Sequence, residues 1–176
     1  MRHPIRLVAA AVLATAIAVP AQLWAGPEKV EFPADYKKWT SFGVLDRYDG
    51  KAVRFLYANP AAMNSVPGNA ANGSVLVLEV RKAKLGADGN PERGADGRFI
   101  ATDEVTAVNV QEKRAGWGTE YPEAKRNGEW EYASFQPSGQ RNAGANIDGC
   151  FSCHKPWVGQ DFTFIFDVFV RDGKPK

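Results

Sequence analysis

Two cysteines and a histidine stand together near the end of the chain, in the segment Cys150-Phe-Ser-Cys153-His154. The 176-residue sequence has no other cysteine, and its only other histidine is His3. Cys-x-x-Cys-His is the attachment signature of c-type haem. Two thiols three residues apart on a turn of helix can add to the two vinyl groups of the porphyrin, while the adjacent imidazole reaches the iron from the same side. The spacing therefore predicts one covalent haem c, attached through Cys150 and Cys153, with His154 as the proximal iron ligand.

Three other interpretations of this segment are weaker. A disulfide between Cys150 and Cys153 would close a very small loop and leave His154 unexplained. A thioredoxin-like redox pair belongs in a βαβ context, whereas these cysteines lie close to the end of a strand-rich chain. A zinc site needs four ligands, and the remaining ones would have to be carboxylates.

The chemistry of such a haem depends on the sixth iron ligand, which electron-transfer cytochromes usually supply as Met or a second His. Beyond the first residue the only methionine is Met63, in a stretch rich in Pro and Asn where a loop or packing role is favoured. Elimination therefore predicts an open or water-occupied position, with ligation by Lys or Tyr as the alternative. An open haem iron binds small molecules such as NO or oxidises small nitrogen compounds.

Residues 1–25 have the pattern of a secretory signal peptide. They contain Arg2 and Arg6, no acidic residue, and an apolar run over residues 7–19 that is followed by Pro20. This run is shorter than the ~20 residues that a membrane-spanning helix needs, which argues against a retained anchor. Cleavage after Ala21 or Ala25 would export the protein to the periplasm. We expect residues 26–176 to form one domain.

Without the leader, the chain carries 20 basic and 20 acidic residues. A neutral domain has no electrostatic reason to hold nucleic acid or an anionic membrane surface. Nucleic-acid and membrane partners are therefore not expected after cleavage.

Aromatic and β-branched content predicts strands over residues 53–58, 74–84, 104–113, 129–135 and 162–171. Short helical segments are expected within residues 32–39 and 60–63. The polar, Gly-rich stretch 84–98 lacks the ligand spacing of a calcium loop and is predicted to be a solvent loop. The expected fold class is α+β, dominated by an antiparallel β-sheet with a few short helices that carries the haem. Seventeen Gly and eleven Pro argue against the long helices of a four-helix cytochrome c′.

The sequence resembles the cytochrome P-460 and cytochrome c′-beta family, small β-rich periplasmic monohaem proteins that are usually homodimers. The resemblance covers most of the mature chain, and it rests on the order and spacing of five segments: 32–39, 53–60, 72–79, 129–132 and 150–154.

Within this family, cytochromes P-460 oxidise hydroxylamine and carry a lysine linked to the porphyrin, in a strand that reads like Gly-Thr-Val-x-Val-Lys-Glu. The corresponding position here is Leu78. Lys82 and Lys84 lie about 13 and 20 Å further along the same strand, at ~3.3 Å per residue. The chain is therefore more similar to the cytochrome c′-beta side, where apolar residues cap an open iron that binds NO.

The resemblance also implies roles for distal residues. Leu78 and Phe55 are the candidates for the apolar cap, with Phe42 behind them. Arg54 is a candidate partner for a haem propionate, because its guanidinium matches a carboxylate. Glu131 is the candidate second-sphere carboxylate and general base. Each of these side chains has core packing or surface solvation as its alternative role.

Two functional hypotheses follow. In the favoured one, the protein binds NO or another small nitrogen ligand on an open iron. In the other, it is a hydroxylamine oxidoreductase that produces NO or nitrous oxide, passes electrons to a soluble cytochrome and uses Glu131 as the base. An electron-transfer cytochrome is a third alternative.

Overall fold

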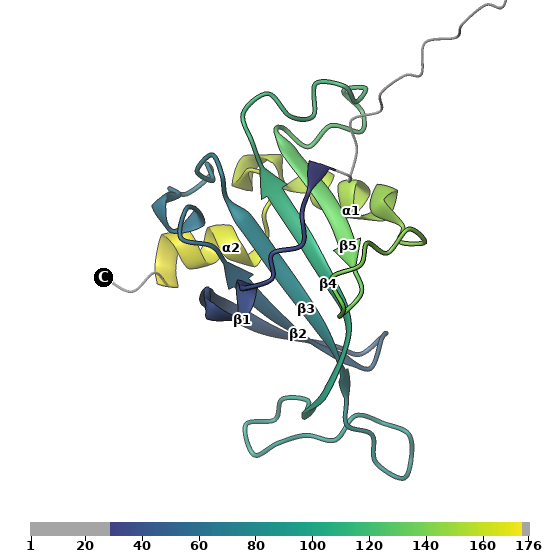
Figure 1. The fold of residues 1–176 in the computed structure, drawn as a ribbon. Coiled ribbons are helices and arrows are strands. Elements are labelled where there is room, and N and C mark those ends of the chain that lie inside the picture. Colours follow the sequence, from purple (N-terminus) through teal and green to yellow (C-terminus); the bar gives the residue numbers. More distant parts are fainter. Residues whose placement is uncertain (1–28, 174–176) are drawn as a thin grey trace, which may run out of the picture.

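A computed structural model describes residues 29–173. Its framework is a single five-stranded sheet in which each strand pairs antiparallel with its neighbour in sequence (Figure 1). The strands are β1 (Thr40–Arg47), β2 (Ala52–Ala58), β3 (Val75–Ala83), β4 (Ala101–Lys113) and β5 (Trp130–Phe135). Two helices follow, α1 (Ile147–His154) and α2 (Ile165–Val168). The β-dominated α+β class predicted from the sequence is confirmed.

Four of the five predicted strands form: β2, β3, β4 and β5 correspond to residues 53–58, 74–84, 104–113 and 129–135. The strand β1 was not expected. It is an edge strand with a β-bulge between Ser41 and Gly43, and most of its residues are only half-buried. Its sequence therefore lacks the continuous apolar signal that marks the central strands.

The fifth predicted strand, over residues 162–171, is wrong. This segment forms α2 and then a π-helix at Phe169–Gly173. Phe162, Phe166 and Val170 are all buried in one core cluster. Their spacing of four residues fits one face of a helix. Positions 164 and 168 between them are also apolar, so the segment shows the every-second-residue pattern that is typical of a strand.

Each face of the sheet is covered by a different part of the chain. The helices α1 and α2 lie against one face, and the N-terminal segment before β1 crosses the other (Figure 1). Phe151, Phe162 and Phe166 pack on the helix-covered face against Leu76 and Tyr132. Val30 and Tyr36 pack on the opposite face, with Val77, Val110 and Phe135. Neighbours along a strand therefore belong to different cores.

The Gly-rich connection between β3 and β4 forms two successive tight turns. In the first, the amide of Gly86 donates to Asn90 and that of Gly89 donates to Gly86. Gly94 and Gly97 repeat the pattern. Gly89 and Gly97 adopt φ near +75° (73° and 75°), which favours glycine. The repeated Gly-Ala-Asp-Gly letters thus encode the same turn twice.

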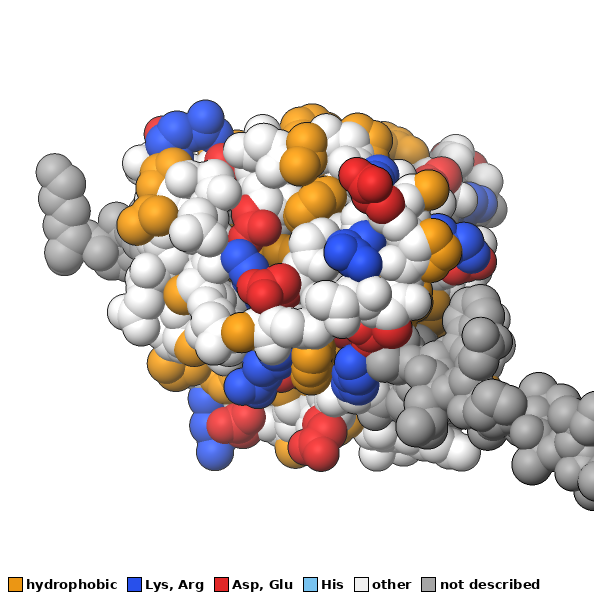
Figure 2. All heavy atoms as spheres, turned by 90° about the horizontal axis from the view of Figure 1, so that it is seen from above, with side chains coloured by type: hydrophobic (Ala, Val, Ile, Leu, Met, Phe, Trp, Pro, Cys, Tyr) orange, Lys and Arg blue, Asp and Glu red, His pale blue; other side chains and the backbone are white. Residues whose placement is uncertain are grey.

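The predicted leader, residues 1–25, lies outside the described part of the chain. Among the residues that are described, no helix is both long and apolar enough to cross a membrane. Acidic and basic side chains are interspersed over the end of the molecule seen in Figure 2. No extended area of one sign is visible there, as expected from the balanced charge.

A buried carboxylate joins the N-terminal segment to the sheet. Glu79, on β3, is fully buried and accepts hydrogen bonds from the Tyr36 hydroxyl and from Nε of Arg81 (2.6 Å). Nζ of Lys37 lies 3.4 Å from the same carboxylate. Burial alone would raise the pKa of Glu79, but the two hydrogen bonds together with the charges of Arg81 and Lys37 outweigh it and hold the pKa below its usual 4.5.

Replacing Tyr36 with Phe should destabilise the fold by about 1.5–3 kcal/mol at neutral pH, because a hydrogen bond to a buried charge is lost. A lowered folded pKa contributes stability above the unfolded value, and this contribution disappears as pH falls through the folded pKa. The difference between Tyr36→Phe and the native protein should therefore shrink below about pH 4.5. Urea unfolding at several pH values measures it.

The control is Tyr57→Phe, because the Tyr57 ring lies 5.4 Å from that of Tyr36 between centroids, and within residues 29–173 no hydrogen bond holds its hydroxyl. This variant should stay within about 0.5 kcal/mol of native stability. Equal losses in both variants, or a Tyr36→Phe deficit that does not depend on pH, would contradict the assigned role of Glu79.

Candidate functional site

The chemistry-bearing residues lie on helix α1. Cys150, Cys153 and His154 stand at positions i, i+3 and i+4, so their side chains leave the same face of the helix. The N-cap Asn146 accepts a hydrogen bond from the Gly149 amide at 2.9 Å, which fixes the first turn. Phe151 is buried in the core and anchors the helix to the sheet. Both thiols are free rather than joined in a disulfide.

A cavity of about 640 Å³ lies between the helix-covered face of the sheet and the segment that carries the Cys-x-x-Cys-His residues. This volume falls in the range of about 300–1,000 Å³ that is typical of cofactor and ligand pockets. Its apolar side chains include Phe42, Leu45, Leu56, Leu76, Leu78 and Phe164, and its polar ones include Arg47, Arg54, Asn109, Gln111 and Ser134. Cys150, Cys153 and His154 line the same cavity.

The imidazole of His154 is fixed by a backbone carbonyl. Its Nδ1 lies 2.7 Å from the carbonyl oxygen of Phe162. A carbonyl can only accept, so Nδ1 carries the hydrogen and Nε2 keeps its lone pair. Burial lowers the pKa of His154, which favours this neutral form. The rings of Tyr132 and Phe164 pack against the imidazole, with centroids 5.0 and 4.6 Å away.

The residues present fit a c-type haem. A metal-binding imidazole commonly donates its second nitrogen to a carbonyl or carboxylate, which is the state of His154. Both thiols are free beside it and open into a cavity of suitable size. Arg54 adds a buried Nε without a hydrogen-bond partner, a cationic donor available to an acidic group. Burial lowers the pKa of this guanidinium, with the nearby Arg47 contributing in the same direction.

A family model described as Cytochrome P460 matches residues 33–165, which include all five strands and the Cys-x-x-Cys-His segment. The chain belongs to the Cytochrome P460 family. This membership implies a haem protein of the c-type cytochrome class. No curated protein gives a significant match to the sequence.

Most of the site residues predicted for this cytochrome P460 domain come together in the structure. Arg54, Leu78 and Phe42 line the same cavity as the thiols and His154. Phe42 also packs edge-on against Phe166, at 5.2 Å between ring centroids. The positions of Leu78 and Arg54 follow from the strand register, which places both on the helix-covered face.

Phe55 and Glu131 lie on the opposite face of the sheet and do not line the cavity. Phe55 packs near Val53 and Phe99, with the Arg81 guanidinium 4.8 Å from its ring centroid. Glu131 is fully buried, stands opposite Glu112 in the strand register and accepts a hydrogen bond from the Tyr121 hydroxyl at 2.9 Å. This geometry gives neither residue a place in a distal pocket.

Lysines and Met63 are also absent from the cavity lining among residues 29–173. Lys82 and Lys84 are exposed and pair with Glu104 and Glu92, at 2.7 and 2.6 Å. Met63 packs against the aromatic core outside the cavity.

Several residues that shape the site were not found from the sequence. Gln111 donates from Nε2 to the Phe162 carbonyl at 3.1 Å, the same oxygen that accepts from His154. Asp161 and Phe162 have φ of 49° and 57°, and this pair of left-handed residues turns the carbonyl back toward the helix. The type of a side chain does not indicate that the backbone carbonyl of the same residue, here Phe162, will act as an acceptor in the site. For Gln111, its alternation with Asn109 on the strand facing Leu78 was an available signal.

Buried Asn127 ties the sheet to helix α1. Its Nδ2 donates to the Phe151 carbonyl at 3.0 Å and to the Tyr132 hydroxyl at 3.1 Å. Asn127→Ala removes both bonds and should destabilise the protein by about 1–3 kcal/mol, measured by chemical unfolding. The matched control Asn90→Ala removes an exposed amide that bonds only Asp88, and should stay within about 0.5 kcal/mol. Similar losses in the two variants would refute the anchoring role of Asn127.

Proposed function

We propose that this protein is a periplasmic monohaem c-type cytochrome whose iron keeps one position open for NO or a related small nitrogen ligand. The observation that carries the proposal is the bond from His154 Nδ1 to the Phe162 carbonyl. It leaves Nε2 as a ligand for iron in a cavity that also holds two free thiols. Family membership supports the haem, because the matched segment contains all three residues.

Haem, when bound, would supply an iron able to bind a small nitrogen ligand, and Cys150, Cys153 and His154 are the residues that would hold it. The chain's own residues orient the imidazole of His154. Tyr132 and Phe164 confine the imidazole, and the Phe162 carbonyl fixes its tautomer. Cys150 and Cys153 would form the thioether bonds. Burial raises the pKa of the Cys150 thiol, which favours its protonated form.

Among the residues of the cavity lining that the structure describes, none is Met or Lys and none is a second His. Tyr132 is the only tyrosine in the described lining, and burial raises its pKa far above neutral, so the phenolate is disfavoured. Its hydroxyl is also held by Gln111 and Asn127. These observations support an open iron position over the electron-transfer alternative.

The cavity lining favours ligand binding over proton chemistry. Leu56 and Leu78 are cross-strand partners, and Leu76 follows on the same face, so this part of the sheet is apolar. Among the described residues of the lining, none is Asp or Glu. A hydroxylamine oxidoreductase would need a base that takes protons from its substrate. We therefore assign binding of NO or a similar ligand as the function, and Leu78 to the apolar cap.

Arg54 is proposed to hold a haem propionate, because its buried Nε has no partner and a guanidinium binds a carboxylate in fork geometry. The periplasmic location rests on the leader-like residues 1–25. A homodimer and a soluble cytochrome as redox partner are further proposals that rest on the resemblance described above.

Protein matured in a periplasm with haem-attachment machinery should carry the mass of one haem under denaturing conditions. Tryptic digestion should release that haem on one peptide, which contains Cys150 and Cys153. His154→Ala should keep the covalent haem but change the ferrous absorption spectrum, because the proximal ligand is lost. Mass spectrometry and spectroscopy of the two proteins measure these outcomes.

The matched control is His3→Ala, which changes the only other histidine, within the expected leader. It should leave the spectrum of the mature protein unchanged. Absence of haem mass in the native protein refutes the site. Haem recovered together with a second peptide, one carrying Lys82 or Lys84, would restore a lysine cross-link and the hydroxylamine oxidoreductase hypothesis.

The ferrous protein should be high-spin and bind NO, with slow or absent hydroxylamine oxidation. Glu131→Gln should leave NO binding and any turnover nearly unchanged, because Glu131 lies on the opposite sheet face. Loss of a true general base would instead cost roughly 10²–10⁴-fold in rate. Absorption titrations with NO and steady-state assays with an electron acceptor measure both. A low-spin ferrous spectrum that ignores NO would support electron transfer, and brisk turnover that Glu131→Gln abolishes would support the enzyme.

A further inference from the structure

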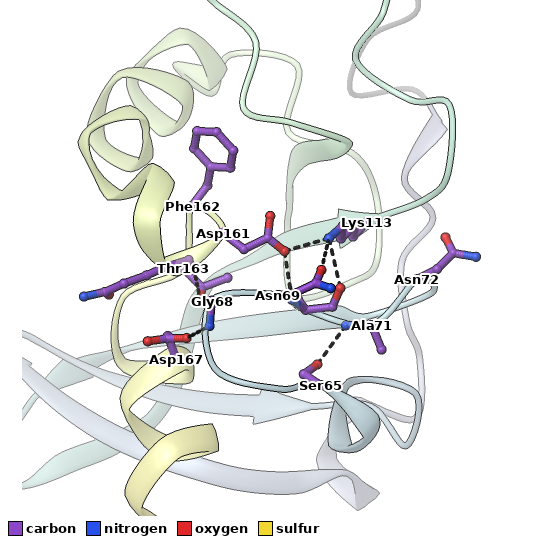
Figure 3. A network of polar contacts seen from close by, with 12 residues as sticks. Ser65, Gly68, Asn69, Ala71, Asn72, Lys113, Asp161, Phe162, Thr163 and Asp167 are labelled. Carbon is purple, nitrogen blue, oxygen red and sulfur yellow. Dashed lines mark hydrogen bonds and ion pairs between the residues drawn. The ribbon is translucent and has the colours of Figure 1, made fainter.

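A buried cation lies next to the turn that follows the Cys-x-x-Cys-His helix. Lys113, at the end of β4, is 8% exposed, and its Nζ lies 2.7 Å from Oδ2 of Asp161. The same ammonium donates to the Ala70 carbonyl at 2.9 Å and to Oδ1 of Asn69 at 3.3 Å. Figure 3 shows Lys113 and Asp161 pointing toward one another, with Asn69 beside them. All three ammonium hydrogens therefore have acceptors.

Asp161 also binds the loop that precedes β3. Its Oδ2 accepts from the Ala70 amide at 2.9 Å, so one carboxylate oxygen joins β4, this loop and the turn after α1. Asp167, two residues into α2, accepts from the Gly68 amide at 2.6 Å and holds the same loop a second time (Figure 3). We call the Lys113–Asp161 ion pair with its bonds to Ala70 the clasp.

The clasp holds a strained piece of backbone. Asp161 and Phe162 are consecutive non-glycine residues with left-handed φ, a conformation that persists only where the surroundings enforce it. The clasp enforces the left-handed conformation of Asp161. Phe162 is enforced by burial of its ring and by Gln111, which donates to its carbonyl. That carbonyl is the acceptor for His154 Nδ1.

We propose that the clasp is a positioning device for the proximal ligand: it fixes the Phe162 carbonyl against His154 and so sets the strength of the His154–iron bond. The inference rests on the proposed haem function and deepens it. A well-placed acceptor at Nδ1 makes an imidazole a more basic ligand, and such hydrogen bonds adjust the potential of haem iron. Lys113 and Asp161 act through Phe162 and contact no ligand themselves.

A purely structural ion pair would predict a different outcome. Its loss would lower stability but leave the ligand bond of any folded haem protein unchanged. The deciding measurements are therefore the iron–histidine stretching band in the resonance Raman spectrum of the ferrous protein and the reduction potential. Haem content per chain is measured in parallel.

The test variant is Lys113→Met with Asp161→Asn, which removes both charges and keeps similar volumes, so that no buried charge is left unpaired. The single variant Lys113→Met accompanies it. The matched control is Lys82→Met, which breaks an exposed Lys–Glu pair of the same 2.7 Å length on the same sheet. All proteins are compared as matured holoproteins.

We expect the double variant to retain one haem per chain, with its iron–histidine band shifted to lower frequency and its potential raised. Lys82→Met should match the native protein in both. A haem-loaded double variant with native band and potential overturns the clasp proposal while leaving the proposed function intact. If the double variant does not fold, Lys113→Met supplies the same comparison. A native protein without haem overturns the proposed function, and this inference with it.

Discussion

The hydrogen bond from His154 Nδ1 to the Phe162 carbonyl is the contact on which the site depends. A free imidazole can present either nitrogen, and one ring in two orientations would make a poor ligand. The carbonyl removes that freedom, because it can only accept. To place this carbonyl against His154, the chain reverses direction at Asp161 and Phe162, after the helix. Both residues are left-handed, so packing in the core must offset their backbone strain. The aromatic packing of Phe162 and the ion pair of Lys113 are consequences of this requirement.

The alternation of side chains along the strands separates two roles: residues on one face of the sheet line the cavity, and residues on the other face stabilise the fold. On β3, Leu78 faces the cavity, while the next residue, Glu79, faces Lys37 of the N-terminal segment and pairs with Arg81 of its own strand. On β5, Tyr132 lies beside His154, while its neighbour Glu131 alternates to the other face and accepts a hydrogen bond from Tyr121. The carboxylates of Glu79 and Glu131 are thereby kept out of the cavity lining, although each is only one residue in the sequence from a side chain that lines it. A shift in register of one residue would exchange the two sets.

The same alternation explains what the sequence could predict. The Cys-x-x-Cys-His segment and the central strands follow from spacing and apolar content, and the strand β3 brings Leu78 to the cavity. Arg54 and Phe55 are consecutive in a strand, however, so they face opposite sides of the sheet, and only Arg54 lines the cavity. Glu131 is outside the lining for the same reason, since its neighbour Tyr132 faces the helix. The role of the Phe162 carbonyl as the acceptor for His154 could not be predicted from the sequence. The direction of the backbone after a helix depends on tertiary contacts such as that of Lys113.

The sheet face that lines the cavity carries both apolar and cationic side chains. Leu56 and Leu78 form an apolar cross-strand pair in the lining, and Arg54, two residues from Leu56 on β2, brings a buried guanidinium to the same face. Such an apolar pair excludes water and stabilises no developing charge, which suits a neutral diatomic ligand better than a substrate that must lose protons. The cationic donor suits the carboxylates of a porphyrin. The residue at position 78 is therefore decisive: a leucine there completes the apolar pair, whereas a lysine would place a nucleophilic amine among these side chains.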